Sequence, residues 1–271
     1  MVMTRMPGST GSAQGELARK AEQLLLAHFG ERPLLLPNAW DVASARAVAN
    51  AGFPVVATSS RAIGEVLGES DDDSSDPDVV FALTERIARA VPVPVTADLQ
   101  AGLRLPPAEL VERLLEAGAV GCNLEDTDHH GDGALVDADR QAAYLAEVRA
   151  AGDRRGVHVV VNARVDAFIR QVGDRAAQVE ETIRRARLYL DAGADCTYPI
   201  AVSHREDVGT LVAAIPRPLN LLARRGGLSI AELTTLGARR ISVASGIFEL
   251  VRERHREIVG SLADGTSLND L

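Results

Sequence analysis

The chain has 271 residues, 46% of them hydrophobic, which suits one large domain with a substantial core. Its formal net charge of −9 and its aromatic content of 3% argue against a nucleic-acid-binding surface with stacking platforms. No apolar run approaches the roughly 20 residues that span a membrane, and the first residues lack the apolar core of a secretory signal, so we expect a cytoplasmic protein without a membrane partner.

The N-terminal part of the chain predicts one helix ahead of the main fold. Residues 14–28 place leucine and alanine at helical spacing, which indicates an amphipathic helix packed on the outside of the domain. Residues 1–13 show no such pattern, and we predict that they are disordered. The rest, 14–271, shows no internal boundary and is predicted to be a single domain that ends in C-terminal helices.

A short unit recurs along the chain and sets the expected fold. Four glycines stand at the end of a helical pattern and directly before an apolar run; they are Gly52, Gly118, Gly193 and Gly237. Glycine readily takes the positive φ that ends a helix, so each unit predicts a helix, a glycine stop and a buried strand. Repetition of this unit is typical of parallel βα folds.

Eight strands alternate with helices in this interpretation. The strands are predicted at 34–36, 54–60, 93–99, 120–126, 157–166, 195–200, 218–224 and 240–246. Helices are predicted at 107–116, 139–151, 175–190 and 229–235, with a charged helix after residue 248. Eight βα units in about 250 residues predict an α/β fold of the TIM-type (β/α)8 barrel class. A doubly wound sheet is the alternative, but the first strand is not followed by a Gly-x-Gly-x-x-Gly turn.

Polar side chains gather where these strands end, which in a barrel is the catalytic mouth. The third strand ends in Asp98, and strand periodicity predicts that Gln100 lies on the same face. Asp98 and Glu125 follow adjacent strands and suit Mg²⁺, which needs only one or two carboxylates, while Gln100 could hold a metal-bound water. Arg164 after a valine run either pairs with a carboxylate or binds a substrate carboxylate.

Two polar loops follow strands at the same end. The acidic loop 69–77 is expected to be solvated, and the loop 127–133 is a candidate lid whose His129 and His130 are either surface residues or proton carriers. Arg224 and Ser245 follow the last two strands, where many barrels bind phosphate, so a phosphosugar enzyme is a rival hypothesis.

Seven short motifs, taken in their order and spacing, resemble one family. They are Leu36-Pro-Asn-Ala-Trp-Asp41, Ala51-Gly-Phe53, Thr58-Ser-Ser60 with Leu67-Gly68, Thr96-Ala-Asp98, Asn123-Leu-Glu-Asp126, Asn162-Ala-Arg-Val-Asp-Ala167 and Ala192-Gly-Ala-Asp195. Over about residues 34–248 the chain thereby resembles the isocitrate lyase/phosphoenolpyruvate (PEP) mutase superfamily, which includes 2-methylisocitrate lyases, oxaloacetate-cleaving enzymes and phosphonate enzymes. The resemblance implies a barrel with a helix exchanged between subunits, in a homodimer or homotetramer.

The resemblance also implies roles for individual residues. It implies a Mg²⁺ ion, or Mn²⁺ in its place, that chelates a small carboxylate substrate. Asp98 corresponds to the direct metal ligand and Glu125 to a carboxylate that often holds the metal through water, and Gln100 stands where the family usually has a second acid. Asp71 and Arg164 correspond to catalytic residues. The substrate-binding residues are expected to be Trp40, Asp41, Ser59, Ser60 and Arg61.

These expectations combine into one hypothesis, a Mg²⁺-dependent lyase that cleaves a C–C bond of a small 2-oxo or 2-hydroxy acid through a metal-stabilised enolate. The lyase branch of the family carries Lys-Lys-Cys-Gly-His in its gating loop, whereas the corresponding loop 127–133 has neither lysine nor cysteine. A P–C bond enzyme acting on phosphonates and a catalytically silent, ligand-binding barrel therefore remain as alternatives.

Overall fold

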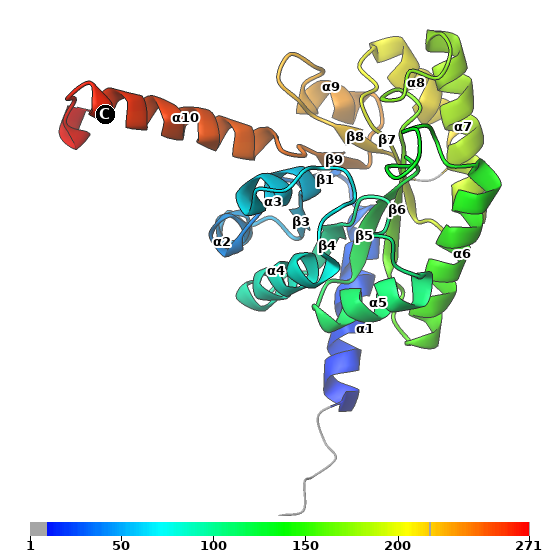
Figure 1. Ribbon diagram of the computed structural model, residues 1–271. Helices are drawn as coiled ribbons and strands as arrows, with labels where there is room; N and C mark the ends of the chain where they lie inside the picture. The colour runs from blue at the N-terminus through cyan, green and yellow to red at the C-terminus, as the bar shows by residue number, and fades with distance from the viewer. Residues whose placement is uncertain (1–9, 217, 271) are drawn as a thin grey trace, which may run out of the picture.

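Parallel strands close into a barrel in the computed structural model, which describes residues 10–216 and 218–270 (Figure 1). The strands are β1 (Leu34–Leu36), β2 (Asn38–Ala39), β3 (Val56–Thr58), β4 (Val95–Asp98), β5 (Gly121–Glu125), β6 (Val160–Val165), β7 (Cys196–Pro199), β8 (Asn220–Leu222) and β9 (Arg240–Ser242). Because only Pro37 separates β1 from β2, the two act as one stave of an eight-membered ring. The predicted barrel is confirmed.

The order of pairing closes this ring. One sheet runs β2-β3-β4-β5-β6-β7 and the other runs β1-β9-β8, with every pairing parallel. A parallel bridge between Thr197 and Leu219 joins β7 to β8, and the β1–β2 stave joins the other two edges. All strand C-termini therefore open at one mouth, where a barrel of this class carries its active site.

Most of the helices surround the ring, while the first packs across one end of it and the last extends away. They are α1 (Thr10–Ala27), α2 (Val42–Asn50), α3 (Ser60–Leu67), α4 (Pro77–Ala90), α5 (Pro107–Glu116), α6 (Ala138–Arg154), α7 (Arg175–Asp191), α8 (Arg205–Ala214), α9 (Ile230–Thr235) and α10 (Gly246–Ala263), followed by the 3₁₀ turn η1 (Leu268–Asp270). The four predicted glycine stops all have positive φ, +88° at Gly52, +81° at Gly118, +106° at Gly193 and +101° at Gly237. The helix–glycine–strand unit is thus confirmed.

Helix α1 packs across the N-terminal end of the strands. It begins at Thr10, four residues before the expected boundary at residue 14, and the Gln14 side chain donates a hydrogen bond of 2.6 Å to the carbonyl of Arg155 at the end of α6. The prediction of disorder for residues 10–13 is therefore wrong, whereas residues 1–9 lie outside the described residues. At Gly121 of β5, a Cβ atom would lie 2.6 Å from Leu24 Cδ2 in α1 and 2.9 Å from the backbone oxygen of Val160, so a side chain there would force these atoms to shift.

Helix α10 leaves the barrel and extends away from it (Figure 1). None of its residues is buried, and an apolar stripe at helical spacing is open to solvent, including Leu250 (47% exposed), Val251 (52%), Val259 (51%) and Leu262 (40%). Its first turns are attached to the barrel by an ion pair between Arg252 and Glu65 of α3. Among the described helices, none has the length and apolar character needed to cross a membrane.

Candidate active site

A cavity of about 410 Å³ opens at the C-terminal ends of the strands. Six of the predicted site residues line it: Ser59, Ser60, Arg61, Asp71, Asp98 and Arg164. Four others lie outside this lining: Trp40, Asp41, Gln100 and Glu125. The barrel thus brings most of the predicted residues together from the C-terminal ends of three strands, β3, β4 and β6.

Asp98 is the last residue of β4 and is held by its neighbours on both oxygens. The backbone N–H and the hydroxyl of Ser60 donate to Oδ2 at 3.0 and 2.8 Å, and Asn123 Nδ2 lies 3.3 Å from Oδ1. The Asp98 N–H donates to Thr58 Oγ1 at 2.9 Å. These bonds fix the orientation of a carboxylate that faces the cavity.

Gln100 does not continue the strand alternation that was expected to place it beside Asp98. Strand β4 ends at Asp98, and Gln100 takes a left-handed backbone with φ of +52°, so its side chain turns to the acidic loop and donates to Asp71 Oδ1 at 2.8 Å. The prediction of a shared face is therefore wrong, because a turn replaces the strand after Asp98. Gln100 instead positions Asp71, which lines the cavity.

The serines after β3 form the start of α3. Ser59 is the N-cap, and its hydroxyl accepts the Ala62 N–H at 3.4 Å. The N–H and hydroxyl of Ser60 already bind Asp98, so within the described chain they hold a protein carboxylate. Arg61 follows with 58% of its side chain exposed, 3.8 Å from Glu65.

Arg164 on β6 pairs with protein carboxylates, which is one of the two alternatives left open by the sequence, and it also lines the cavity. Its Nε and Nη2 donate to Asp166 at 2.7 and 2.9 Å, and its Nη1 pairs with Glu125 Oε2. Burial by itself lowers the pKa of Arg164, but Glu125 and Asp166 raise it well above the usual value. The guanidinium is therefore a permanent cation beside Asp98.

Glu125 lies behind Arg164, only 3% exposed. Its Oε1 pairs with His129 of the loop after β5, and its Oε2 pairs with Arg164. Burial raises the pKa of Glu125, while Arg164 and His129 oppose that shift. The hydrogen bond that the His129 ring makes to the Glu125 carboxylate in turn raises the pKa of His129. Both oxygens of Glu125 thus pair with basic side chains of the protein, Arg164 and His129.

Asp73 ties three mouth loops together, a role that its sequence context did not signal. Its buried carboxylate accepts the N–H groups of Ala101 (3.2 Å) and Leu103 (2.9 Å) through Oδ1, and Oδ2 lies 3.3 Å from His130 Nε2. The expected solvated loop is therefore anchored at this residue. Within the run Asp71-Asp72-Asp73 nothing in the sequence separates the buried carboxylate from the exposed ones.

A buried polar chain underlies Asn123 in the barrel interior. Asn123 Oδ1 accepts from Asn162 Nδ2 (2.8 Å) and Arg240 Nη2 (3.1 Å), which leaves its amide nitrogen facing Asp98. Arg240 is 1% exposed and also lies 3.5 Å from His28 Nε2. Burial, followed by the charge of Arg240, lowers the pKa of His28 to about 4, so this ring is neutral. The floor of the site thus contains a cation hydrogen-bonded to neutral groups.

Trp40 and Asp41, predicted to bind substrate, lie outside the lining of the mouth cavity and make structural contacts. Asp41 is the N-cap of α2, where its Oδ1 accepts the Ser44 N–H at 2.7 Å in a capping box. Trp40 packs edge-on against Phe248 of α10, with 5.2 Å between ring centroids. These two residues therefore connect the first strand to α2 and hold the start of α10 against the barrel.

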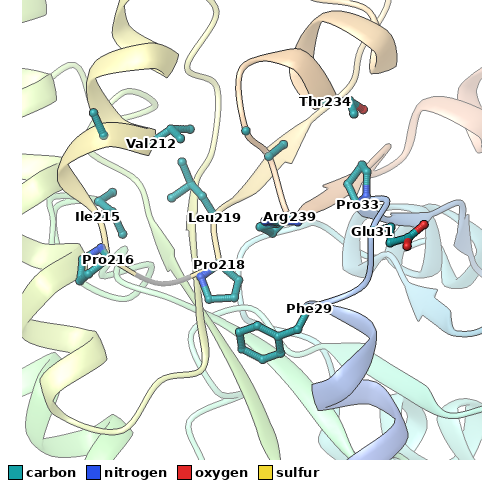
Figure 2. A pocket seen from close by; sticks show the side chains of 13 residues that line it. Phe29, Glu31, Pro33, Val212, Ile215, Pro216, Pro218, Leu219, Thr234 and Arg239 are labelled. Atoms are coloured by element: carbon teal, nitrogen blue, oxygen red, sulfur yellow. The ribbon is translucent and has the colours of Figure 1, made fainter.

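A second hollow, of about 680 Å³, lies at the opposite end of the barrel (Figure 2). Figure 2 shows mainly apolar side chains around it, including Phe29, Val212 and Leu219, with Glu31 and Arg239 as the charged members of its lining. None of the predicted site residues lies there. The predicted carboxylates and Arg164 lie at the mouth of the barrel, so we take the mouth cavity as the candidate active site.

Comparison with known proteins places this geometry in a family. Residues 25–263 match the sequence profile of the family described as phosphoenolpyruvate phosphomutase. The uncharacterized protein MT2054 of Mycobacterium tuberculosis (strain CDC 1551 / Oshkosh) is 32% identical over 219 residues, 80% of each chain. A crystal structure of a candidate phosphonomutase from Burkholderia cenocepacia J2315 has a TM-score of 0.83 and 33% identity, covering 90% of this chain and 99% of that one.

The crystal structure of 2,3-dimethylmalate lyase, a PEP mutase/isocitrate lyase superfamily member, has a TM-score of 0.81 and 26% identity over 91% of this chain and 87% of that one. The parallel barrel, with a carboxylate and an arginine at its mouth, identifies the protein as an enzyme of the TIM-barrel class. This chain belongs to the phosphoenolpyruvate phosphomutase family, within the isocitrate lyase/PEP mutase superfamily. The resemblance seen in the motifs is confirmed, and the superfamily comprises lyases and mutases that act on small carboxylates and phosphonates.

Proposed function

We propose that the protein is a Mg²⁺-dependent lyase that cleaves a C–C bond of a small 2-oxo or 2-hydroxy carboxylic acid. The observation that supports this most is the single cavity lined by Asp98, Arg164 and the Ser59–Arg61 segment. An oriented carboxylate suits a hard cation, and an adjacent permanent guanidinium suits an anionic reacting group. Together they provide for charge that grows as a bond to the carbon next to the 2-oxo group breaks.

The oxygen ligands of this cavity fit Mg²⁺ better than a metal ion that is held entirely by protein side chains. Among the residues described, no group of three or more His, Cys, Asp and Glu side chains could hold a metal ion. Mg²⁺ needs fewer protein ligands, because it keeps several waters and takes others from its substrate. Asp98 would hold the ion directly, with Asp71 on the same cavity, and Mn²⁺ would use the same oxygens. Gln100 would position Asp71 through its hydrogen bond, and Glu125 would position Arg164 through its ion pair.

The remaining residues take complementary roles. Bound Mg²⁺ would supply a Lewis acid for the oxygens of the substrate. Arg164 faces the charge that develops on the product, and Asp166 and Glu125 keep its guanidinium in place. Arg61, exposed at the start of α3, contributes a cation for the substrate carboxylate. Asp71, positioned by Gln100 at the cavity wall, is our candidate for proton transfer.

Cleavage of a P–C bond is the second candidate. The match over residues 25–263 to a family described as phosphoenolpyruvate phosphomutase favours it, as does the likeness to the candidate phosphonomutase. The same oxygen and arginine groups would then serve a phosphonate.

We also propose that two copies of the chain exchange α10 in a homodimer or larger homo-oligomer. The exposed apolar stripe of α10 has no partner within the described chain, because the helix extends away from its own barrel (Figure 1). Burial of that stripe against a second copy would remove it from water.

Titration calorimetry with oxalate, a mimic of the pyruvate enolate, tests the proposed function. We expect oxalate to bind in the presence of Mg²⁺ and not after its removal by EDTA. Asp98→Ala should abolish the binding, whereas Asp72→Ala, an exposed residue of the same acidic loop, should leave it unchanged. Undiminished binding by Asp98→Ala would refute the assignment. A panel of 2-oxo and phosphono acids assayed for pyruvate release then separates C–C from P–C cleavage.

A further inference from the structure

Three polar side chains form one row across the last strands of the barrel. The parallel bridge between β7 and β8 sets Tyr198 level with Asn220, and Asn220 is paired in register with Arg240 of β9. Side chains at level positions of neighbouring parallel strands lie on the same face of the sheet. Tyr198 lines the mouth cavity and Arg240 reaches Asn123 inside the ring, so all three side chains point into the barrel. We call Tyr198, Asn220 and Arg240 the donor row.

Each member of the donor row has a polar atom without a hydrogen-bond partner among the described residues. These atoms are the Tyr198 hydroxyl, Asn220 Nδ2 and Arg240 Nε, and the three residues are at most 3% exposed. Asn220 uses only its other polar atom, because Oδ1 accepts the Ser242 hydroxyl at 3.3 Å. Burial raises the pKa of Tyr198 to about 12, although Ser242 opposes this shift, so the hydroxyl keeps its proton. The row therefore offers three buried hydrogen-bond donors.

The row also carries a positive charge that the described residues do not neutralise. Arg240 donates to the amide oxygen of Asn123 at 3.1 Å and lies 3.5 Å from His28 Nε2, and both of these groups are neutral. Burial lowers the pKa of Arg240, and the neighbours that oppose this, which include the Asp98 carboxylate, do not reverse it. A guanidinium stays protonated in proteins, and a buried charge is costly unless an opposite charge lies beside it.

A small monovalent anion meets both needs. A water molecule can accept these hydrogen bonds, but it would leave the guanidinium charge without a counter-charge. Both terminal nitrogens of Arg240 have contacts, with Asn123 and His28, so the guanidinium does not present the paired fork that binds a planar carboxylate. Single N–H and O–H groups from three neighbouring strands suit a spherical ion.

We propose that the donor row binds a chloride ion, or another halide, inside the barrel beneath the mouth cavity. The ion would balance the charge of Arg240, which orients Asn123, and Asn123 in turn faces Asp98. It would stabilise the folded state without taking part in the reaction. The inference therefore does not depend on the proposed function.

Urea unfolding of the full chain in mixtures of sodium chloride and sodium gluconate at constant ionic strength tests the site, because gluconate is too large for a buried position. In the wild-type protein, the folding equilibrium constant should rise about tenfold for each tenfold rise in chloride above its dissociation constant. Bromide should act like chloride. In crystals grown with bromide, its anomalous scattering should place the ion within hydrogen-bond distance of the donor row.

Variants assign the effect to the row. Asn220→Leu and Tyr198→Phe each remove one donor and keep the charge of Arg240, so both should weaken the chloride dependence. Thr197→Val is the control, because Thr197 is equally buried on β7 but faces the opposite side of the strand from Tyr198. The chloride dependence of this control should match that of the wild-type protein.

Three results would overturn the inference. Equal stability of the wild-type protein in chloride and gluconate would assign the three donors to ordered water. Bromide found only on the surface would mean an adventitious ion only, as would a chloride dependence that Asn220→Leu and Tyr198→Phe share in full with Thr197→Val. Direct competition of chloride with oxalate would show that the donor row belongs to the substrate site instead.

Discussion

The replacement Tyr189→Phe tests the buried network that supports the reacting side of the barrel. Asp126, directly after β5, is fully buried, and its Oδ2 accepts from the Tyr189 hydroxyl at 2.7 Å and from Arg185 Nη1 at 3.2 Å. Its Oδ1 accepts the N–H of Asp166 at 2.9 Å, and Asp166 in turn holds Arg164. The variant removes one donor from Asp126 and changes no charge.

The magnitude depends on the protonation state of Asp126. Burial, with the charge of Asp166, raises the pKa of Asp126 from 3.8 to about 6. Since the folded state binds this proton more tightly, the contribution of the group to stability is complete below pH 4 and is lost as pH rises through 6, by about 3 kcal/mol. At pH 7 the carboxylate is charged, and the Tyr189 bond to it is worth about 1.5–3 kcal/mol.

Urea unfolding followed by circular dichroism at pH 7 and pH 5 measures the effect. At pH 7 we expect Tyr189→Phe to lower the free energy of unfolding by about 2 kcal/mol, or Tm by roughly 4–8 °C. At pH 5 the bond joins neutral partners, so the loss should shrink to about 1 kcal/mol. Tyr144→Phe is the control, because its hydroxyl donates to the neutral carbonyl of Leu105 at 3.0 Å. Its cost should be the same at both pH values.

Equal costs for Tyr189→Phe at pH 5 and pH 7 would refute the reasoning, as would a cost that grows towards low pH. Either result would mean that Asp126 does not carry a charge at pH 7 that the tyrosine hydroxyl stabilises. A pH-dependent cost for Tyr144→Phe would show instead that the trend belongs to the whole fold.

Three further predictions concern the floor, the oligomer and the base of the barrel. Arg240→Met removes a buried cation whose hydrogen bonds go to neutral groups, so Tm should stay the same or rise. Mg²⁺-dependent oxalate affinity should fall tenfold or more, because Asn123 loses a hydrogen bond that orients it. Unchanged oxalate affinity would show that Arg240 does not support the site through Asn123. Val251→Glu on the α10 stripe should lower the molecular mass seen by analytical ultracentrifugation, whereas Ile230→Glu on α9 should not; an equal effect would remove α10 from the interface. Gly121→Ala should cost about 1–3 kcal/mol in urea unfolding, because its Cβ would lie 2.6 Å from α1, and a neutral result would show that α1 moves aside.

The sequence predicted the periodic parts of this protein well, because periodicity and glycine stops act over a few residues. The helix–glycine–strand unit, the eight staves and the boundaries of α5 are found where local patterns placed them. The same locality explains why the sequence pointed to Asp98, Arg164, Ser59 and Ser60, since each lies at or next to the end of a recognisable strand, and all four line the mouth cavity. Their convergence needed only the rule that parallel strand ends share one mouth.

Other features of the site could not be read from the sequence, because they depend on contacts between distant segments. Gln100 was expected on the strand face with Asp98, but a left-handed turn sends it to Asp71, 29 positions away. Glu125 has the local signature of a ligand, yet only the folded barrel shows its oxygens paired with Arg164 and His129. Whether a polar side chain faces a cavity or an ion-pair partner is decided by which neighbours the fold supplies.

The sequence by itself determined the class of fold, the family and the chemical character of the polar mouth. Only the tertiary structure decided that Asp73 anchors the loops, that Arg240 supports Asn123, and that Glu125 pairs with Arg164 and His129. The physical reason is that backbone pattern is set by neighbouring residues, whereas burial and charge pairing are set by residues that meet only when the ring of strands closes.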